Sequence, residues 1–417
     1  ASISISGGPG TYNYGNVTVG SSATNTFTLT NGGGVAASAL SETGLAAPFT
    51  YVGGSYPGTG GTCGGTLSVS ASCDIVVVYT PSGTGVSLDT INVSYFNGAA
   101  TTAATRDVQG TGIGAAVLAI SDGPGAYNFT TRPTGSSTTR TFTLNNTGGS
   151  QSTGISGAGL ASPFQFVGGT FPGGGTCGVT LNAGANCTFI VEYAPIAISA
   201  SDIDTIQVSY NNGASAQNTT RDVAGAAVAP ASITISDTDP YNFGTIATGS
   251  SSTKTFTVTN TGGFQATAVA EIGLAAPFTY VGGTYPGTLG TCTNTLAAGA
   301  NCTLVVQYAP GVASPLDTDT LTVSYNDGVA VQTANRTVQG TATTPANITI
   351  SEADPYNYGT VATGASLNYT FTLTNTGGFT ASAISETGLA APFAFAGAAF
   401  PGTGGTCTAT LAPAAAC

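Results

Sequence analysis

The sequence predicts an all-β protein built from tandem β-sandwich domains. Three observations lead to this fold class. Motifs recur along the chain at a fixed interval, apolar and polar residues alternate within short segments, and segments rich in Gly, Pro, Asn and Ser separate those segments.

The recurrence defines the domain boundaries. The segments ASISIS, AVLAIS, ASITIS and ANITIS begin at residues 1, 116, 231 and 346, which is one copy every 115 residues. This interval matches a small independent domain and is too long for one turn of a solenoid. We therefore predict three full domains at 1–115, 116–230 and 231–345, and an incomplete fourth at 346–417.

Within each repeat the pattern is that of β-strands. Phe27 and Leu29 alternate with threonines in TFTLTN, and Ile91, Val93 and Tyr95 lie on one side of TINVSY. No segment sustains helical spacing. About seven short strands per hundred residues is the pattern of an immunoglobulin-like sandwich, which we predict for each repeat.

One hairpin has a register that the sequence predicts. Asn97-Gly98 favours a two-residue type I′ turn, and a turn centred there places Asp89 opposite Arg106. We expect a cross-strand ion pair, although two solvated charges that mirror each other are the alternative. An exposed pair would contribute about 0–1 kcal/mol. The same reasoning pairs Asp204 with Arg221 and Asp319 with Arg336.

All eight cysteines lie in four copies of a C-x9-C motif. A metal site would need clustered Cys or His ligands, and a redox pair is typically C-x-x-C, so a structural disulfide within each repeat is favoured. A loop of about ten residues closed in this way stabilises by about 2.5–3 kcal/mol. Disulfides persist in oxidising compartments, which indicates a protein outside the cytoplasm. The expected pairs are Cys63–Cys73, Cys177–Cys187, Cys292–Cys302 and Cys407–Cys417.

These motifs resemble a known family. TFTLTNTGG, GLAAPF, the C-x9-C segment, a strand ending in Tyr-x-Pro, and DTxxVSYNDG followed by VQGTG are similar to bacterial secreted or surface repeats of the ASH/Hydin-like immunoglobulin type, known as choice-of-anchor D domains. The resemblance covers essentially the whole chain, four times over. It implies tandem immunoglobulin-like sandwiches in secreted or cell-surface proteins, and it carries no catalytic signature.

Composition excludes several functions. The net charge of −12, with one lysine, disfavours nucleic-acid binding. The sequence contains no uninterrupted apolar run of about 18 residues, so it predicts no transmembrane helix. The chain has no histidine, the usual base of a hydrolytic triad, so we expect no enzyme activity.

Paired acids are the remaining candidates for chemistry. Two carboxylates can serve glycoside hydrolysis, but these pairs lie in turn-rich segments, where solvated turn acids are the simpler interpretation. We expect no cofactor, with calcium at the repeat junctions as the one candidate. The acid pairs are Asp202 and Asp204, Asp237 and Asp239, Asp317 and Asp319, and Glu352 and Asp354; the calcium candidates are Asp237, Asp239, Glu352 and Asp354.

The sequence favours an extracellular structural role. Nearly uniform repeats with short connections suit a bacterial surface filament, fibre or stalk whose subunits self-associate, with other surface components as further partners. The alternative is an adhesin that binds carbohydrate or protein through loops, by avidity. The fourth repeat stops at Cys417, so we expect either a window from a longer chain or strand addition by a neighbouring subunit.

Overall fold

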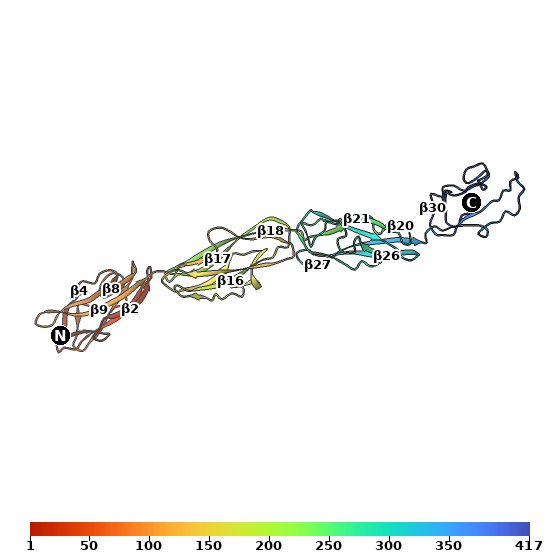
Figure 1. Cartoon of the computed structure of the whole chain (residues 1–417). Coiled ribbons are helices and arrows are strands. Elements are labelled where there is room, and N and C mark those ends of the chain that lie inside the picture. Colours follow the sequence, from red (N-terminus) through yellow and green to blue (C-terminus); the bar gives the residue numbers. More distant parts are fainter. The chain divides into compact units, whose positions relative to one another are not determined.

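The computed structural model describes residues 1–417 and is made of β-strands, apart from one short 3₁₀ turn, η1 (Val167–Gly169) (Figure 1). No helix in it has the length and apolar character needed to cross a membrane. Contacts between residues group the chain into two compact units, Ala1–Ala227 and Val228–Cys417, which are described separately.

In the first unit, repeat 1 forms two sheets that face each other. One sheet has the order β1-β3-β7-β5, and the other has the order β2-β9-β8-β4-β6. The strands of repeat 1 pair in antiparallel fashion except β2 with β9, which pair in parallel. The strands are β1 (Ile3–Ile5), β2 (Tyr12–Thr18), β3 (Ala23–Asn31), β4 (Ala37–Glu42), β5 (Phe49–Tyr51), β6 (Thr66–Leu67), β7 (Ser72–Tyr79), β8 (Gly85–Phe96) and β9 (Thr101–Ile113).

Repeat 2 has the same topology, with sheets of order β10-β12-β16-β14 and β11-β18-β17-β13-β15. Its strands are β10 (Leu118–Ile120), β11 (Tyr127–Pro133), β12 (Thr138–Asn146), β13 (Ser152–Ala158), β14 (Phe164–Phe166), β15 (Thr180–Leu181), β16 (Asn186–Tyr193), β17 (Ser199–Asn211) and β18 (Ala216–Val228).

In the second unit, repeat 3 forms sheets of order β19-β21-β25-β23 and β20-β27-β26-β22-β24. Its strands are β19 (Ile233–Ile235), β20 (Tyr241–Ala247), β21 (Ser252–Asn260), β22 (Ala266–Ile272), β23 (Phe278–Tyr280), β24 (Thr295–Leu296), β25 (Asn301–Tyr308), β26 (Ser314–Asn326) and β27 (Val331–Thr343).

The predicted fold class is confirmed: each full repeat is an immunoglobulin-like sandwich. There are nine strands per repeat, against the predicted number of about seven, for two local reasons. The first strand is divided into β1 and β2 because the segment SGGPG carries the chain from one sheet to the other, with Gly7 at a φ of 105°. The two-residue β6 is the other addition.

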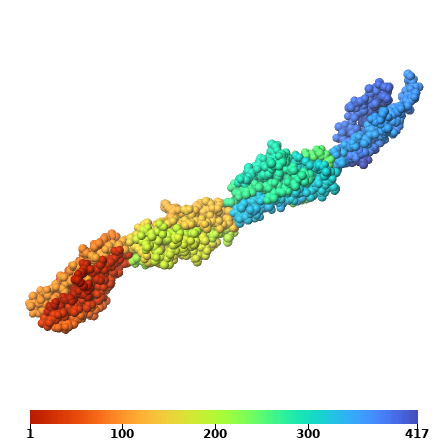
Figure 2. Space-filling view, turned by 60° about the horizontal axis from the view of Figure 1, so that its bottom comes forward, coloured from red at the N-terminus to blue at the C-terminus, as the bar shows by residue number.

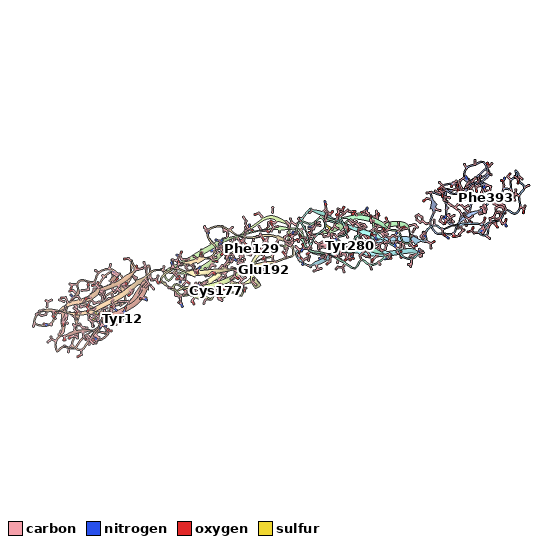
Figure 3. The ribbon with its side chains drawn as sticks, viewed as in Figure 1. Tyr12, Phe129, Cys177, Glu192, Tyr280 and Phe393 are labelled. Atoms are coloured by element: carbon pink, nitrogen blue, oxygen red, sulfur yellow. A yellow bond between two sulfur atoms is a disulfide. The ribbon has the colours of Figure 1, made fainter.

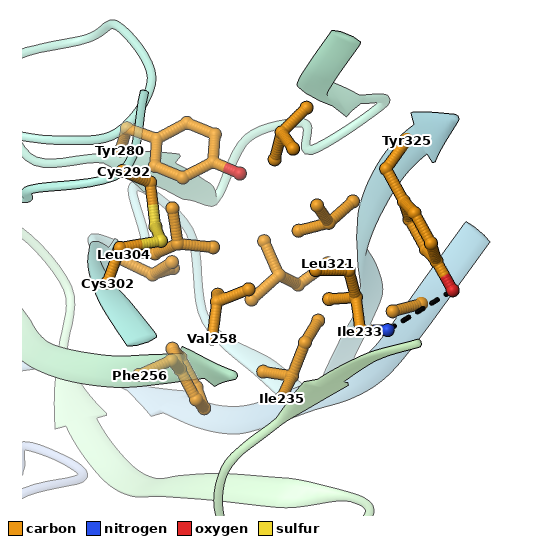
Figure 4. Close-up of a cluster of buried hydrophobic side chains, with 14 of the residues drawn as sticks. Ile233, Ile235, Phe256, Val258, Tyr280, Cys292, Cys302, Leu304, Leu321 and Tyr325 are labelled. Carbon is orange, nitrogen blue, oxygen red and sulfur yellow. Dashed lines mark hydrogen bonds between the residues drawn. A yellow bond between two sulfur atoms is a disulfide. The ribbon is translucent and has the colours of Figure 1, made fainter. Parts of the chain in front are cut away.

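The core of each full repeat lies between its two sheets, as Figure 4 shows for repeat 3. Phe256 and Val258 alternate inward from β21, and Leu321 meets them from the opposite sheet. The ring of Phe278 stacks on that of Tyr308, with centroids 4.8 Å apart. A fully buried aromatic side chain of this kind contributes about 1.5–3 kcal/mol. The alternation of apolar residues in the sequence therefore gives the observed core.

Two further contacts fix the sandwich of repeat 3. The Tyr325 hydroxyl accepts a hydrogen bond from the Ile233 amide at 3.2 Å, which ties β26 to the first strand (Figure 4). Tyr308 lies against Gly340, where an added Cβ would stand 2.5 Å from its ring. Only glycine at position 340 leaves room for the tyrosine.

Repeat 4 contains counterparts of residues 231–302 and forms two small two-stranded sheets. Its strands are β28 (Ile348–Ile350), β29 (Leu373–Asn375), β30 (Ala381–Ser382) and β31 (Thr410–Leu411). Phe393 is 52% exposed, whereas its counterpart Phe278 is fully buried, because residues 346–417 have no equivalents of β26 and β27 (Figure 3). In the space-filling view repeat 4, in blue, is divided into two branches (Figure 2).

Candidate functional site

Each repeat contains one disulfide, as its cysteine spacing predicted. The Cα atoms are 4.8 Å apart in the first three bridges and 4.9 Å apart in the fourth, and no cysteine is free. In repeat 2 the bridge joins Cys187 of β16 to Cys177 in the preceding loop (Figure 3). The loop that follows the aromatic-Pro-Gly turn is thereby attached to a central strand.

A buried asparagine recurs at the end of one strand in every repeat. Asn260 closes β21 and is fully buried. Its Nδ2 donates to three backbone carbonyls, and its Oδ1 accepts from two backbone amides. The carbonyls belong to Phe264 (2.8 Å), Leu296 (3.1 Å) and Ala297 (3.2 Å), and the amides to Ser232 (3.1 Å) and Gly262 (3.0 Å).

The counterparts of Asn260 are equally buried. Asn31, Asn146 and Asn375 each join the first strand of their repeat to two loops through the same kind of side-chain bonds. Four or five backbone groups thus bond to one buried side chain in each repeat: five for Asn31 and Asn260, four for Asn146 and Asn375.

The predicted Asp–Arg ion pairs are wrong. Asp89 lies opposite Val108, and Arg106 lies opposite Ile91. The hairpin turn is centred one residue later than predicted, because Asn97 pairs with Ala100 across it. A turn displaced by one residue moves the register by two. The pairings Asp204–Arg221 and Asp319–Arg336 fail for the same reason, since Asp204 faces Val223 and Asp319 faces Val338.

The same side chains make structural hydrogen bonds instead. Arg106 donates to the carbonyls of Gly7, at 2.8 Å, and Gly8, where the chain crosses between the sheets. Asp89 accepts from the Ala46 amide at 2.9 Å. In the other full repeats Arg221 donates to the Asp122 carbonyl, Arg336 to that of Ile235, Asp204 accepts from Ala161 and Asp319 from Ala275.

The structure contains two ion pairs, and both differ from those expected. Arg140 Nη2 lies 2.9 Å from Asp122 Oδ1, and Lys254 Nζ lies 2.7 Å from Asp237 Oδ1. Hydrogen bonds from Lys254 and Ser236 lower the pKa of Asp237. Each cation also lies over a tyrosine ring, Tyr127 in repeat 2 and Tyr241 in repeat 3.

The acidic residues considered for calcium are not brought together. No group of three or more His, Cys, Asp or Glu side chains is placed to hold a metal. Asp239 accepts the Thr337 amide at 2.9 Å, and Glu352 accepts the Tyr369 hydroxyl at 2.6 Å. Asp354 makes no hydrogen bond through its side chain. A calcium role for Asp237, Asp239, Glu352 and Asp354 therefore stays a prediction without geometric support.

Two other acids of these pairs are also bonded. Asp202 accepts the Tyr193 hydroxyl and Asp317 accepts the Tyr308 hydroxyl, each at 2.6 Å. Burial and these hydrogen bonds raise the pKa of both tyrosines. In each pair the two acids stand two residues apart on one strand, and all four carboxylates accept a hydrogen bond.

The first and last long strands of a repeat lie side by side. In repeat 3, β20 pairs in parallel with β27 from Tyr241–Val338 to Ala247–Thr343. The chain enters this pair at the start of β20 and leaves it at the end of β27. A force that separates the two ends of the repeat therefore loads these hydrogen bonds in shear, all at once.

Repeat 2 has a pocket of about 530 Å³ beside β13. Gly157 is one of its lining residues, and sequence reasoning missed it even though repeats 1, 3 and 4 have glutamate at this position. The buried asparagines were also missed, although a strand that ends in Asn in all four repeats was a visible signal. Polar residues at the end of an apolar strand are usually assigned to turns.

Comparison with known proteins supports the sequence resemblance. Residues 234–341 match the family model described as HYDIN/CFA65/VesB-like, Ig-like domain. This range lies within repeat 3 and includes its disulfide and buried asparagine. No match was found among the curated proteins.

Solved structures with similarity to the chain include three that differ widely in kind. A protein of unknown function from Porphyromonas gingivalis W83 is 12% identical over 53% of this chain and 98% of its own, with a TM-score of 0.21. The Vibrio cholerae VesB protease is 17% identical over 26% of this chain and 31% of its own, with a TM-score of 0.22. Titin domains I67–I69 are 9% identical over 80% of this chain and 95% of their own, with a TM-score of 0.28. Similarities this low carry no argument about function.

Proposed function

Because repeat 3 is an immunoglobulin-like domain of the HYDIN/CFA65/VesB-like family, and the other repeats share its motifs, we propose that the chain is an extracellular structural protein. In this proposal it is a subunit of a surface filament, fibre or stalk, and its subunits associate with one another. The four disulfides support an oxidising location, and a bacterial surface is the location that this proposal includes.

The observation that carries the proposal is the parallel pairing of the terminal strands. In repeats 1 and 3 the pairs β2–β9 and β20–β27 have equivalent registers. Tension along the chain must break such a pair in shear before the sandwich can open. The linkers between repeats are short. Only Gly114 and Ala115 separate β9 from Ala116, whose amide donates a hydrogen bond to the Asn212 carbonyl, so the linker can extend little before tension reaches the strands.

The proposal includes no catalytic activity. Two observations support this part of the proposal. The sequence has no histidine, and most of the paired carboxylates accept hydrogen bonds that join strands to loops or to each other. The net charge of −12 also argues against a nucleic-acid partner.

Negative-stain microscopy of the native material tests the structural role. Long regular filaments or fibres whose repeat matches this chain are the expected result. Pulling the chain by its ends is the second test, and each full repeat should unfold as one cooperative event. Reduction should lengthen each event by about 30 Å, because ten further residues at about 3.3–3.6 Å each are released, less the 4.8 Å already spanned between the cysteine Cα atoms. Material without filaments, in which the repeats yield gradually under load, would refute the proposal.

An adhesin is the second candidate, and the pocket of repeat 2 is the observation that favours it. A tandem array with a binding site on one repeat can attach a surface to a ligand and still bear load. Binding of the chain to a glycan or protein array, lost when the pocket is filled, would favour this role.

A further inference from the structure

The pocket of repeat 2 occupies a place that a side chain fills in the other repeats. It lies between β13 with its following loop, on one side, and the loop from Phe166 to Val179 on the other. Its main lining residues are Ile155, Gly157, Leu160, Phe166, Phe171 and Val179. None of the residues around it is charged.

In the other repeats a glutamate side chain stands at this point and bonds to the backbone. Glu42 Oε1 accepts the Leu45 amide at 2.7 Å, and Glu271 Oε1 accepts the Leu274 amide at 2.7 Å. In repeat 4 Glu386 accepts the Leu389 amide at 2.6 Å. The leucine amide of GLAAPF thus has a carboxylate partner in three repeats.

Repeat 2 has lost that carboxylate. Gly157 stands in place of the glutamate, and the amide of Leu160, which corresponds to those leucines, makes no hydrogen bond to the protein. Phe166 and Phe171 stand where repeats 1 and 3 have tyrosines. The Phe171 ring leans onto Gly157, and a Cβ added there would stand 2.3 Å from it, so the ring must move aside when a larger side chain takes this position. The donor for a carboxylate is therefore retained at the edge of an aromatic-lined pocket.

The mouth of the pocket is apolar in repeat 2. Val179 is 69% exposed there, whereas the same position is Gly65 in repeat 1 and Asn294 in repeat 3. An exposed valine beside two phenylalanines offers an apolar ligand group a surface to cover.

We propose that repeat 2 binds a carboxylate carried on a short apolar stem, which takes the place of the missing glutamate. The stem lies against Phe166, Phe171 and Val179, and the carboxylate accepts a hydrogen bond from the Leu160 amide. A charge-assisted bond of this kind is stronger than one between neutral groups. A free organic acid and a glutamate side chain of an extended partner peptide share this chemistry. The site is independent of the proposed structural role.

Titration of the full, oxidised chain with 3-phenylpropanoate, followed by amide-resolved NMR, tests the proposal. We expect a saturable shift of the Leu160 amide, one site per chain, and no matching shift of Leu45 or Leu274. The uncharged 3-phenylpropanamide, a control of nearly the same shape, should bind at least about tenfold weaker, the loss that accompanies removal of a charged acceptor. A capped Ala-Glu-Ala peptide is the second probe. The tighter of the two probes identifies the source as a free acid or a partner side chain.

Two matched variants complete the test. Gly157→Glu combined with Phe166→Tyr and Phe171→Tyr rebuilds the set found in repeats 1 and 3, so it should fold and lose binding. The reciprocal change in repeat 1 is Glu42→Gly combined with Tyr51→Phe and Tyr56→Phe, and it should raise the stoichiometry from one site to two. Three results would each overturn the proposal: neither 3-phenylpropanoate nor the peptide binds saturably, 3-phenylpropanamide binds as tightly as 3-phenylpropanoate, or the rebuilt repeat 2 binds as well as the original.

Discussion

Replacing the buried asparagine of repeat 3 should destabilise that repeat more than any other single polar substitution in it. Asn260→Ala removes a hydrogen bond from three carbonyls and two amides of the sandwich, of which the Ala297 carbonyl keeps the Ala300 amide as a second partner. A buried group left without a hydrogen bond costs about 1–3 kcal/mol, and water entering the space of the lost amide can satisfy some of the five. We therefore expect a loss of about 3–5 kcal/mol, a large part of the about 5–15 kcal/mol that stabilises a typical domain.

Hydrogen exchange read by mass spectrometry is the suitable assay, since it resolves repeat 3 from its neighbours in the intact chain. Protection of peptides from β21 and β25 should fall by a factor of about 10²–10³·⁵, the same loss expressed as an equilibrium ratio. Asn294→Ala is the matched control, because that side chain is exposed and makes no hydrogen bond. If Asn260→Ala lowers protection less than about fivefold, or no more than Asn294→Ala does, the reasoning about the five partners is refuted.

Three further predictions concern the charges of a hairpin, a buried tyrosine and a disulfide. A double-mutant cycle on Asp89→Ala and Arg106→Ala should show a coupling energy within about 0.5 kcal/mol of zero, as for residues that share no contact. Thermal unfolding measures this energy, and a larger value would support the ion pair that the structure lacks. Burial, and then a hydrogen bond to a carboxylate, raise the pKa of Tyr308. The contribution of this protonated tyrosine to the free energy of unfolding is therefore complete below the ordinary tyrosine pKa of about 10, and it is lost as the pH rises through the higher pKa of the folded state. Tyrosinate absorbance in an alkaline titration should accordingly appear late and together with unfolding, and early reversible ionisation of all tyrosines would contradict this. The double substitution Cys292→Ala and Cys302→Ala should lower the unfolding free energy of repeat 3 by about 2.5–3 kcal/mol, as chemical denaturation can measure against the untouched repeats.

The fold was predictable because its signals are local and repeated. Alternation in TFTLTN gave the strand and its buried face, and the C-x9-C spacing gave the disulfides. The repeat boundaries needed only self-comparison. The repeat boundaries and the closed loops survive an error of one residue, and the buried face of a strand is read from the residues themselves without any assumption about its pairing.

The register did not survive such an error. Asn97-Gly98 correctly indicated a hairpin, but the Asn97 side chain accepts the amides of Ala99 and Ala100 and the turn forms one residue later. Arg106 then reaches the carbonyl of Gly7, a residue far away in sequence that no local pattern connects to it. The recurrence of the asparagine was visible in the sequence, but its hydrogen bonds were not predictable, since its partners lie in three separate segments. Gly157 was visible in the repeats, but a glycine becomes a pocket only once the surrounding loops are in place.

The contrast between Asn260 and Gly157 indicates how such an array can acquire binding without losing its framework. The asparagine is present in all four repeats and bonds four or five backbone groups in each, five in the case of Asn260. The glutamate that Gly157 replaces holds one leucine amide at the edge of a loop in repeat 1, and a single such bond contributes about 1.5–3 kcal/mol at most. A repeat can therefore give up the glutamate at a small cost in stability, whereas loss of the asparagine removes a large part of the free energy of unfolding. The two roles separate on this basis: refilling position 157 should abolish carboxylate binding while the extension at which repeat 2 unfolds under load stays the same.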